Sequence, residues 1–198
     1  MAGELTRRSV IASAAIVPVA ALSSASQPAQ AAEPSVFSPA QLRILTAFVD
    51  RIVPRDELGP SASESGVTNY ISLSMADYLA GEKAAFMDGL EAMDAFARRS
   101  QDRAFAELSP EKQDAVLIAM ESGNATGFAN AQGFFIRVRR LTLEGMFGDP
   151  HYGGNKNFAG WDLIRYPGPR MATSADDQKM GVEIKPVHRS AYGADGHH

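Results

Sequence analysis

The side chains that most often carry out chemistry are scarce in this sequence, and their spacing indicates little. There is no cysteine, and the four histidines stand at positions 151, 188, 197 and 198. No two of them have the i,i+4 spacing that places a metal-binding pair on one helical face. Asp149 and His151 form the best local pair for acid–base catalysis or for a metal ion. Asp149 also precedes a proline, however, and an Asp-Pro step is a common way to begin a turn.

Other catalytic and cofactor-binding motifs are equally hard to find. The sequence contains no G-x-S-x-G, the motif that exposes the nucleophilic serine of many hydrolases. Gly153-Gly154 lacks the preceding strand and following helix of a dinucleotide-binding loop. Without cysteine, the chain cannot attach c-type haem, ligate an iron–sulfur cluster through thiolates or form a disulfide. We therefore expect no catalytic residue, no cofactor and no metal on this chain.

The N-terminal segment has the pattern of an export signal. Arg7 and Arg8 directly precede a modestly apolar, Ala-rich run at 10–22, which is shorter than the roughly 20 residues of a membrane-spanning helix. Ala29-Gln30-Ala31 fits an A-x-A cleavage site. The adjacent arginines before a weakly apolar core predict a twin-arginine signal peptide over residues 1–31. The alternative is an ordinary secretory signal.

A twin-arginine signal is unexpected on a chain of this kind. That route carries proteins already folded, often with a cofactor inserted, whereas this chain offers no obvious cofactor ligands. One explanation is that the cofactor belongs to another chain that is exported together with this one.

The part of the chain between residues 32 and 148 is dominated by helical patterns. Ser38-Pro39 with Gln41 forms a capping box at the start of a helix that ends at Pro54. Another helix begins where Ser109 is expected to cap, Pro110 takes the first position and Glu111 favours the helix dipole. Further helical spacing covers 66–80, 82–98 and 126–147, and Gly123-Asn124 ends the helix that starts at Ser109. The residues expected to face inward are Leu42, Leu45, Phe48, Val49, Ile52, Val67, Ile71, Met75, Tyr78 or Leu79, Phe86, Leu90, Met93, Ala97, Phe105, Leu108, Phe128, Phe135, Val138, Leu141 or Thr142, and Met146.

These patterns predict an all-α fold, a small bundle of about five helices with Met and Phe stripes as its core. No stretch alternates with period two for long enough to predict a strand. The composition is that of one globular domain, and a net charge of −4 without a basic stripe gives no reason to expect nucleic acid.

After residue 148 the character of the chain changes. Residues 149–198 are rich in Gly and Pro, and they predict a long irregular segment that belongs to the same domain as the bundle at 32–148. Its candidate functional residues form turns or bury aromatic surface, and they are Tyr152, Gly153, Gly154, Asn155, Phe158, Trp161 and Tyr166. Two interpretations remain: the segment packs against its own bundle as a clasp, or it forms a surface for a partner. Residues 170–198 are in turn either disordered or extended along the bundle or a partner.

The order of motifs in this segment resembles one known family. Asp149-Pro150, Tyr152-Gly153-Gly154-Asn155, Gly160-Trp161 and Ile164-Arg165-Tyr166-Pro167-Gly168 resemble the C-terminal part of the gluconate 2-dehydrogenase subunit 3 family. The Arg-Arg signal, the helix that begins near Ser38 and the stretch LTLEGMFGDP are similar too. The specific part of the resemblance spans residues 144–168, and the polar tail after Pro169 matches no feature of the family.

The resemblance implies a small, non-catalytic subunit of an exported oxidoreductase complex. Its relatives partner a large FAD-containing dehydrogenase of the glucose–methanol–choline type, which oxidises a sugar, sugar acid or alcohol, and often a multihaem cytochrome c subunit that receives the electrons. The small subunit carries the signal that brings the folded flavoprotein to the twin-arginine translocase. FAD and haem are thus expected on the partners. A periplasmic location follows, with membrane association through the cytochrome.

Two other functions remain open at this point. The chain is alternatively a stand-alone exported helical binding protein, or an enzyme that uses Asp149 and His151. The family supplies no catalytic residue to this sequence, so residues 149–168 inherit only a structural or interface role from the resemblance.

Overall fold

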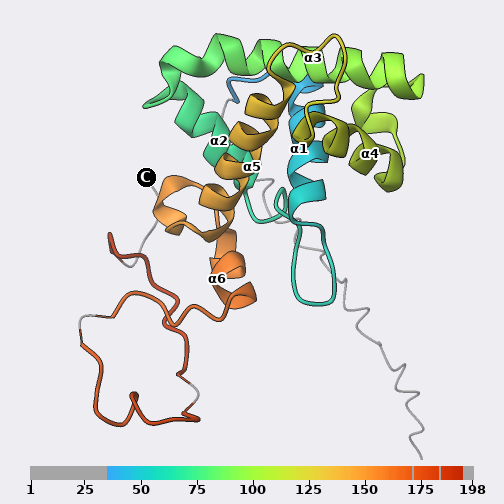
Figure 1. Ribbon diagram of the computed structural model, residues 1–198. Coiled ribbons are helices and arrows are strands. Elements are labelled where there is room, and N and C mark those ends of the chain that lie inside the picture. Colours follow the sequence, from blue (N-terminus) through green and yellow to red (C-terminus); the bar gives the residue numbers. More distant parts are fainter. Residues whose placement is uncertain (1–34, 171, 183, 194–198) are drawn as a thin grey trace, which may run out of the picture. The chain divides into compact units, whose positions relative to one another are not determined.

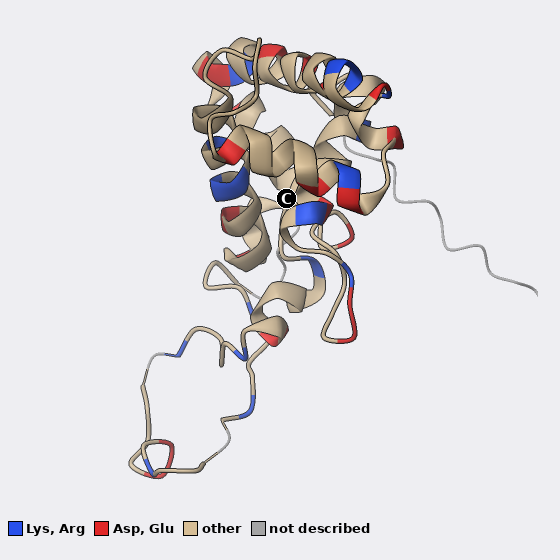
Figure 2. Ribbon diagram, turned by 45° about the vertical axis from the view of Figure 1, so that its right-hand side comes forward, with Lys and Arg blue, Asp and Glu red and all other residues tan. Residues whose placement is uncertain are grey.

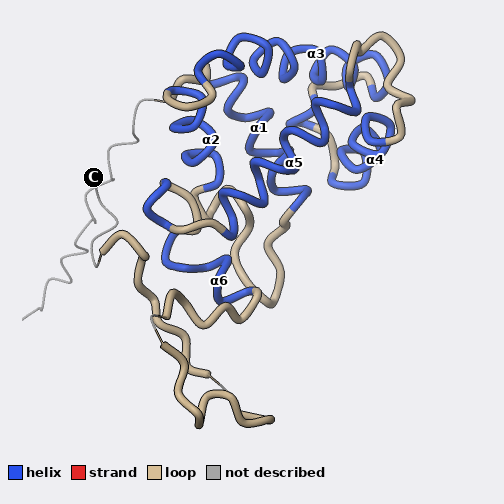
Figure 3. The backbone as a smooth tube through the Cα atoms, turned by 60° about the vertical axis from the view of Figure 1, so that its left-hand side comes forward, coloured by secondary structure: helices blue, strands red, loops and turns tan. Residues whose placement is uncertain are grey.

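The computed structural model describes residues 35–170, 172–182 and 184–193, and all helices in these ranges lie between residues 39 and 163 (Figures 1 and 3). The predicted export signal, with Arg7 and Arg8, lies outside the described residues. The helices are α1 (Pro39–Ile52), α2 (Val67–Ala76), α3 (Lys83–Gln101), α4 (Pro110–Glu121), α5 (Ala131–Phe147) and α6 (Ala159–Leu163). Short 3-10 turns are η1 (Ala80–Glu82), η2 (Phe105–Glu107), η3 (Pro150–Tyr152) and η4 (Lys156–Phe158). The predicted all-α bundle is confirmed.

The first helix begins as the sequence predicts. The Ser38 hydroxyl accepts a hydrogen bond from the Gln41 backbone N–H at 3.2 Å, and the Gln41 side chain accepts one from the Ser38 N–H at 3.0 Å. This reciprocal pair satisfies two of the N–H groups that have no partner within a helix. Ser109 holds the corresponding position before α4, but the predicted cap is wrong, because its side chain caps no backbone N–H there; Pro110 and Glu111 occupy the first turn as predicted.

Several helix boundaries differ from the predicted ones: α2 ends at Ala76 and not at residue 80, and α3 continues to Gln101 and does not end at residue 98. α5 begins at Ala131 and not near residue 126, because Gly127 and Asn130 adopt left-handed backbone angles that interrupt a right-handed helix. The segment after residue 148 is irregular, as predicted, but it also contains η3, η4 and α6. Helical turns of three to five residues are too short to show a 3.6-residue period.

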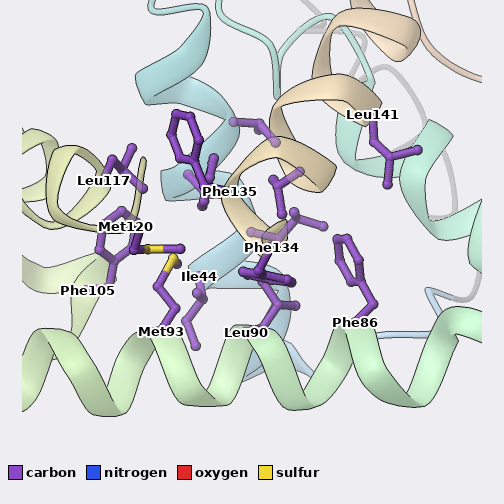
Figure 4. Close-up of a cluster of buried hydrophobic side chains, with 14 of the residues drawn as sticks. Ile44, Phe86, Leu90, Met93, Phe105, Leu117, Met120, Phe134, Phe135 and Leu141 are labelled. Carbon is purple, nitrogen blue, oxygen red and sulfur yellow. The ribbon is translucent and has the colours of Figure 1, made fainter. Parts of the chain in front are cut away.

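The core is formed where α3 crosses α1 and α5. Phe86, Leu90 and Met93 on α3 point toward Ile44 on α1 and Phe134 on α5 (Figure 4). The predicted inward residues are buried here or packed against the core, including both Leu141 and Thr142. In the pair left open by the sequence, Leu79 is buried and Tyr78 is exposed.

Lys and Arg residues are interspersed with Asp and Glu over the helices, and no single-sign face stands out in Figure 2. Among the described residues, no helix has both the length and the apolar character needed to cross a bilayer.

Candidate interaction surface: the clasp at the end of α5

The C-terminal end of α5 is covered by residues 149–168, which we call the clasp. The last carbonyl groups of a helix have no partner within it. The indole N–H of Trp161 donates to the Phe147 carbonyl at 2.9 Å, and the Asn155 side-chain amide donates to the Gly148 carbonyl at 2.8 Å. The clasp therefore supplies hydrogen-bond donors where the helix needs them.

Asn155 is the most enclosed polar side chain of the clasp. It is 0% exposed and adopts a left-handed backbone conformation with φ of 46°. While its amide nitrogen donates to Gly148, its Oδ1 accepts the backbone N–H of Gly160 at 2.8 Å. Both polar atoms of the Asn155 amide are thus hydrogen-bonded, and these bonds connect the end of α5 to the start of α6.

The clasp backbone lies directly against the backbone of α5. A Cβ atom added at Gly160 would lie 1.8 Å from the Met146 carbonyl oxygen, and one added at Gly154 would lie 2.2 Å from the Gly145 carbonyl oxygen. No side chain larger than hydrogen fits at either distance. These glycines are therefore required for the clasp to approach the helix.

The clasp also holds the start of α2. The Asn69 side chain donates to the Gly153 carbonyl at 3.0 Å, and the Lys156 N–H donates to the Ser65 carbonyl at 2.8 Å. Through these bonds, the clasp joins the beginning of α2 to the end of α5.

The seven candidate residues therefore fall into two groups. Gly153, Gly154, Asn155 and Trp161 contact the bundle, and Trp161 is only 5% exposed. Tyr152 and Tyr166 are exposed, while Phe158 is half-buried with its ring centroid 5.3 Å from that of Trp161. The first group builds the clasp, and the second forms its outer surface.

The tail returns to this outer surface, and we call residues 187–192 the strap. Nε2 of His188 lies 2.6 Å from Oδ1 of Asp162, and the His188 ring stacks on Phe158 with 5.0 Å between centroids. Tyr192 stacks on His151 at 4.5 Å between centroids, and its hydroxyl lies 2.6 Å from that of Tyr152. No sequence pattern predicts these contacts, because each joins residues far apart in the chain without a repeating spacing.

Asp149 accepts hydrogen bonds from both the clasp and the strap. Its Oδ1 accepts the His151 N–H at 2.9 Å, and its Oδ2 accepts the Ala191 N–H at 2.8 Å. Burial acts to raise the pKa of Asp149, but hydrogen bonds from the His151 backbone, the Ser190 side chain and the Ala191 backbone outweigh it and lower the pKa. A carboxylate held ionised by backbone donors begins a turn and anchors the strap, which weakens the acid–base interpretation.

Other possible ligand sites are few. Within the described ranges, no group of three or more His, Asp or Glu residues could hold a metal ion. A cavity of about 430 Å³ lies between α3 and the first half of α5, with Phe86, Phe128 and Phe134 among its lining residues. Arg137 pairs with Glu82 at the same cavity, and the Arg137 Nε is buried without a hydrogen-bond partner.

The fold and the clasp together define a small helical protein with two tyrosines exposed on the outer side of the clasp. The chain belongs to the gluconate 2-dehydrogenase subunit 3 family, whose model matches residues 39–168. The match begins with α1 and ends with the last residue of the clasp, so the predicted resemblance is confirmed and the strap lies beyond it. No curated protein and no solved structure matched the chain.

Proposed function

We propose that this chain is the non-catalytic small subunit of an exported FAD-dependent dehydrogenase complex, where it escorts and stabilises the large flavoprotein. Membership in a family described as gluconate 2-dehydrogenase subunit 3 carries the proposal, since it supports a subunit role in a dehydrogenase complex. The large partner is of the glucose–methanol–choline type and oxidises a sugar, sugar acid or alcohol. A multihaem cytochrome c subunit receives the electrons.

The export step of the proposal depends on the N-terminal sequence. Arg7 and Arg8 direct the assembled pair of subunits to the twin-arginine translocase, and the complex works in the periplasm, associated with the membrane through its cytochrome. FAD resides on the large subunit and haem on the cytochrome, so this chain needs no cofactor of its own.

The clasp supports the proposal, because it offers a surface to which the large subunit could bind. Buried contacts of Trp161 and Asn155 fix it on the bundle, so its outer side is a pre-organised surface. Exposed Tyr152 and Tyr166 stand on that side, and tyrosine is among the residues that dominate binding energy at protein interfaces. Leu73 extends the surface onto α2, because this exposed side chain lies beside Gly153.

Co-expression tests the proposal. The flavoprotein is produced with the wild-type chain, with the Arg7→Lys/Arg8→Lys variant, or alone, and its FAD content and periplasmic dehydrogenase activity are measured. We expect FAD loading with either form of the chain and periplasmic activity only with the wild type. A flavoprotein that binds FAD and reaches the periplasm equally well alone would contradict the proposal.

The cavity beside Arg137 favours a second candidate, a stand-alone exported binding protein. This function predicts a stable monomer that purifies without a flavoprotein and binds a small ligand between α3 and α5. Ligand binding that is lost in Phe134→Ala but retained in Tyr152→Ala would support it over the subunit role.

A further inference from the structure

The strap follows a long loop between the clasp and residue 187, which we call the excursion. The chain leaves the clasp after Gly168, runs outward and returns, as Figure 1 shows in orange and red. The excursion is closed at its base by two bonds: the Val187 N–H donates to the Pro167 carbonyl at 3.0 Å, and Arg170 donates to the Lys185 carbonyl at 2.8 Å. Residues 187–192 then lie along the clasp.

The clasp is complete without the strap. Trp161 bonds to Phe147, and Asn155 bonds to Gly148 and Gly160, so none of the bonds that attach the clasp to α5 involves a strap residue. The family match likewise ends before the strap begins. The strap therefore adds to a clasp that is attached to α5 by its own bonds, and removal of the strap leaves those bonds in place.

Most side-chain contacts that hold the strap are exposed to solvent; the exception is Ser190, which is 5% exposed and whose side chain hydrogen-bonds to Asp149. The side chains of the His188–Asp162 pair are 43% and 50% exposed, and Tyr192 is 63% exposed where it meets Tyr152. Exposed ion pairs and hydrogen bonds add little stability, and ordering the chain opposes them. The strap is thus held weakly compared with the buried contacts beneath it.

We propose that the strap is a releasable cover, which occupies part of the partner-binding surface in the free subunit and is displaced when the large flavoprotein subunit docks. This inference rests on the proposed function. It assigns the surface under the strap, namely the rings of Phe158, His151 and Tyr152 with the carboxylates of Asp149 and Asp162, to the interface.

The strap also indicates the chemistry of the segment that replaces it. Release leaves Asp149 without the Ala191 N–H and Asp162 without the His188 ring nitrogen, so two carboxylates each lack a donor. It also uncovers the ring faces of Phe158 and His151. An extended segment of the large subunit that carries planar side chains and N–H or cationic donors matches this uncovered surface in shape and in charge.

The experiment uses the full mature chain and the large flavoprotein subunit obtained by co-expression. The double variant His188→Ala/Tyr192→Ala removes both ring contacts of the strap. Met180→Ala is the matched control, because Met180 lies in the same excursion and is fully exposed. The dissociation constant of each form for the flavoprotein is measured, together with hydrogen exchange of the Val187 and Ala191 amides in the free and bound subunit.

We expect the double variant to bind the flavoprotein more tightly than the wild type, by about tenfold if the strap is docked nine-tenths of the time, with Met180→Ala unchanged. The Val187 and Ala191 amides lose protection in the free double variant and in the wild-type complex, whereas the Gly160 amide stays protected. Equal or weaker binding by the double variant, or strap amides that stay protected in the complex, overturns this inference alone. If no form binds the flavoprotein, the proposed function fails and the inference fails with it.

Discussion

The clasp has two contacts of opposite character, one with α5 and one with the strap. Against α5, Trp161 and Asn155 are enclosed and both donate to backbone carbonyls. Against the strap, aromatic rings and carboxylates meet at the surface, where the side chain of His188 is 43% exposed and Tyr192 is 63% exposed. The same residues, 149–168, thus combine an enclosed attachment with one that is open to solvent.

Asp149 joins the first turn of the clasp to the strap. One carboxylate oxygen fixes the turn at His151, and the other accepts the Ala191 N–H of the strap. The predictions that follow separate the two contacts, from the largest expected effect to the smallest.

Replacing Trp161 should have the largest effect on stability. Trp161→Ala removes a buried indole and leaves the Phe147 carbonyl without its donor, so we expect the free energy of unfolding of the mature chain to fall by about 3–5 kcal/mol. Chemical denaturation measures this loss. The control Ile164→Ala, in an exposed side chain of the same segment, should change stability by less than about 0.5 kcal/mol. A similar small change in both variants would show that the clasp is not part of the stable fold.

Asn155→Asp should have the next largest effect. The change keeps an acceptor for the Gly160 N–H but removes the donor to the Gly148 carbonyl, which we expect to cost about 1–3 kcal/mol at neutral pH. Burial raises the pKa of the introduced carboxyl above its unfolded value, and its neutral form can still donate. The variant should therefore be closest to the wild type at acid pH and lose stability as the pH rises. Asn157→Asp, at an exposed neighbouring position, is the control and should show no such loss.

Replacing Asp149 should have a smaller effect on the free energy of unfolding, with a pH dependence opposite to that of Asn155→Asp. Its pKa in the folded chain is lowered, so its ionised form stabilises the fold above the ordinary Asp pKa of about 4. That contribution is lost as the pH falls through the lowered pKa. Denaturation of the wild type and of Asp149→Asn at a series of acid pH values should give curves that converge toward low pH. Curves that stay parallel over this range would assign no stabilising role to the carboxylate.

Tyr192→Phe should have the smallest effect. The substitution deletes only the hydroxyl that lies 2.6 Å from the Tyr152 hydroxyl at an exposed position, so the free energy of unfolding should change by less than about 0.5 kcal/mol. Hydrogen exchange of the Ala191 amide should nevertheless become faster, because the strap is held by few contacts. A loss of global stability comparable to that of Trp161→Ala would remove the distinction between the two contacts.

The sequence predicts the bundle well because its signals are local. The spacing of Phe86, Leu90 and Met93 assigns them to one helical face, and the Ser38–Gln41 capping box needs only four consecutive residues. Where two inward candidates were adjacent, as with Tyr78 and Leu79, only the fold decided between them.

The clasp is partly predictable, and the strap is not. Gly153, Gly154 and Asn155 indicated turns, but the bonds from Asn155 to Gly148 and Gly160 depend on a left-handed backbone that composition does not specify. The contact between His188 and Asp162 spans 26 positions of irregular chain. No periodicity connects such residues, so a tertiary structure is needed to see that they meet.

The position of Trp161 has a practical consequence for spectroscopy. It is the only tryptophan of the chain, and its ring lies 5.3 Å from Phe158 and 4.9 Å from Tyr166 between centroids. His188 stacks on the same Phe158, one ring away from the indole. Tryptophan fluorescence of the unlabelled subunit therefore arises at a single site beside the strap, which provides a natural optical probe for the arrival of a partner.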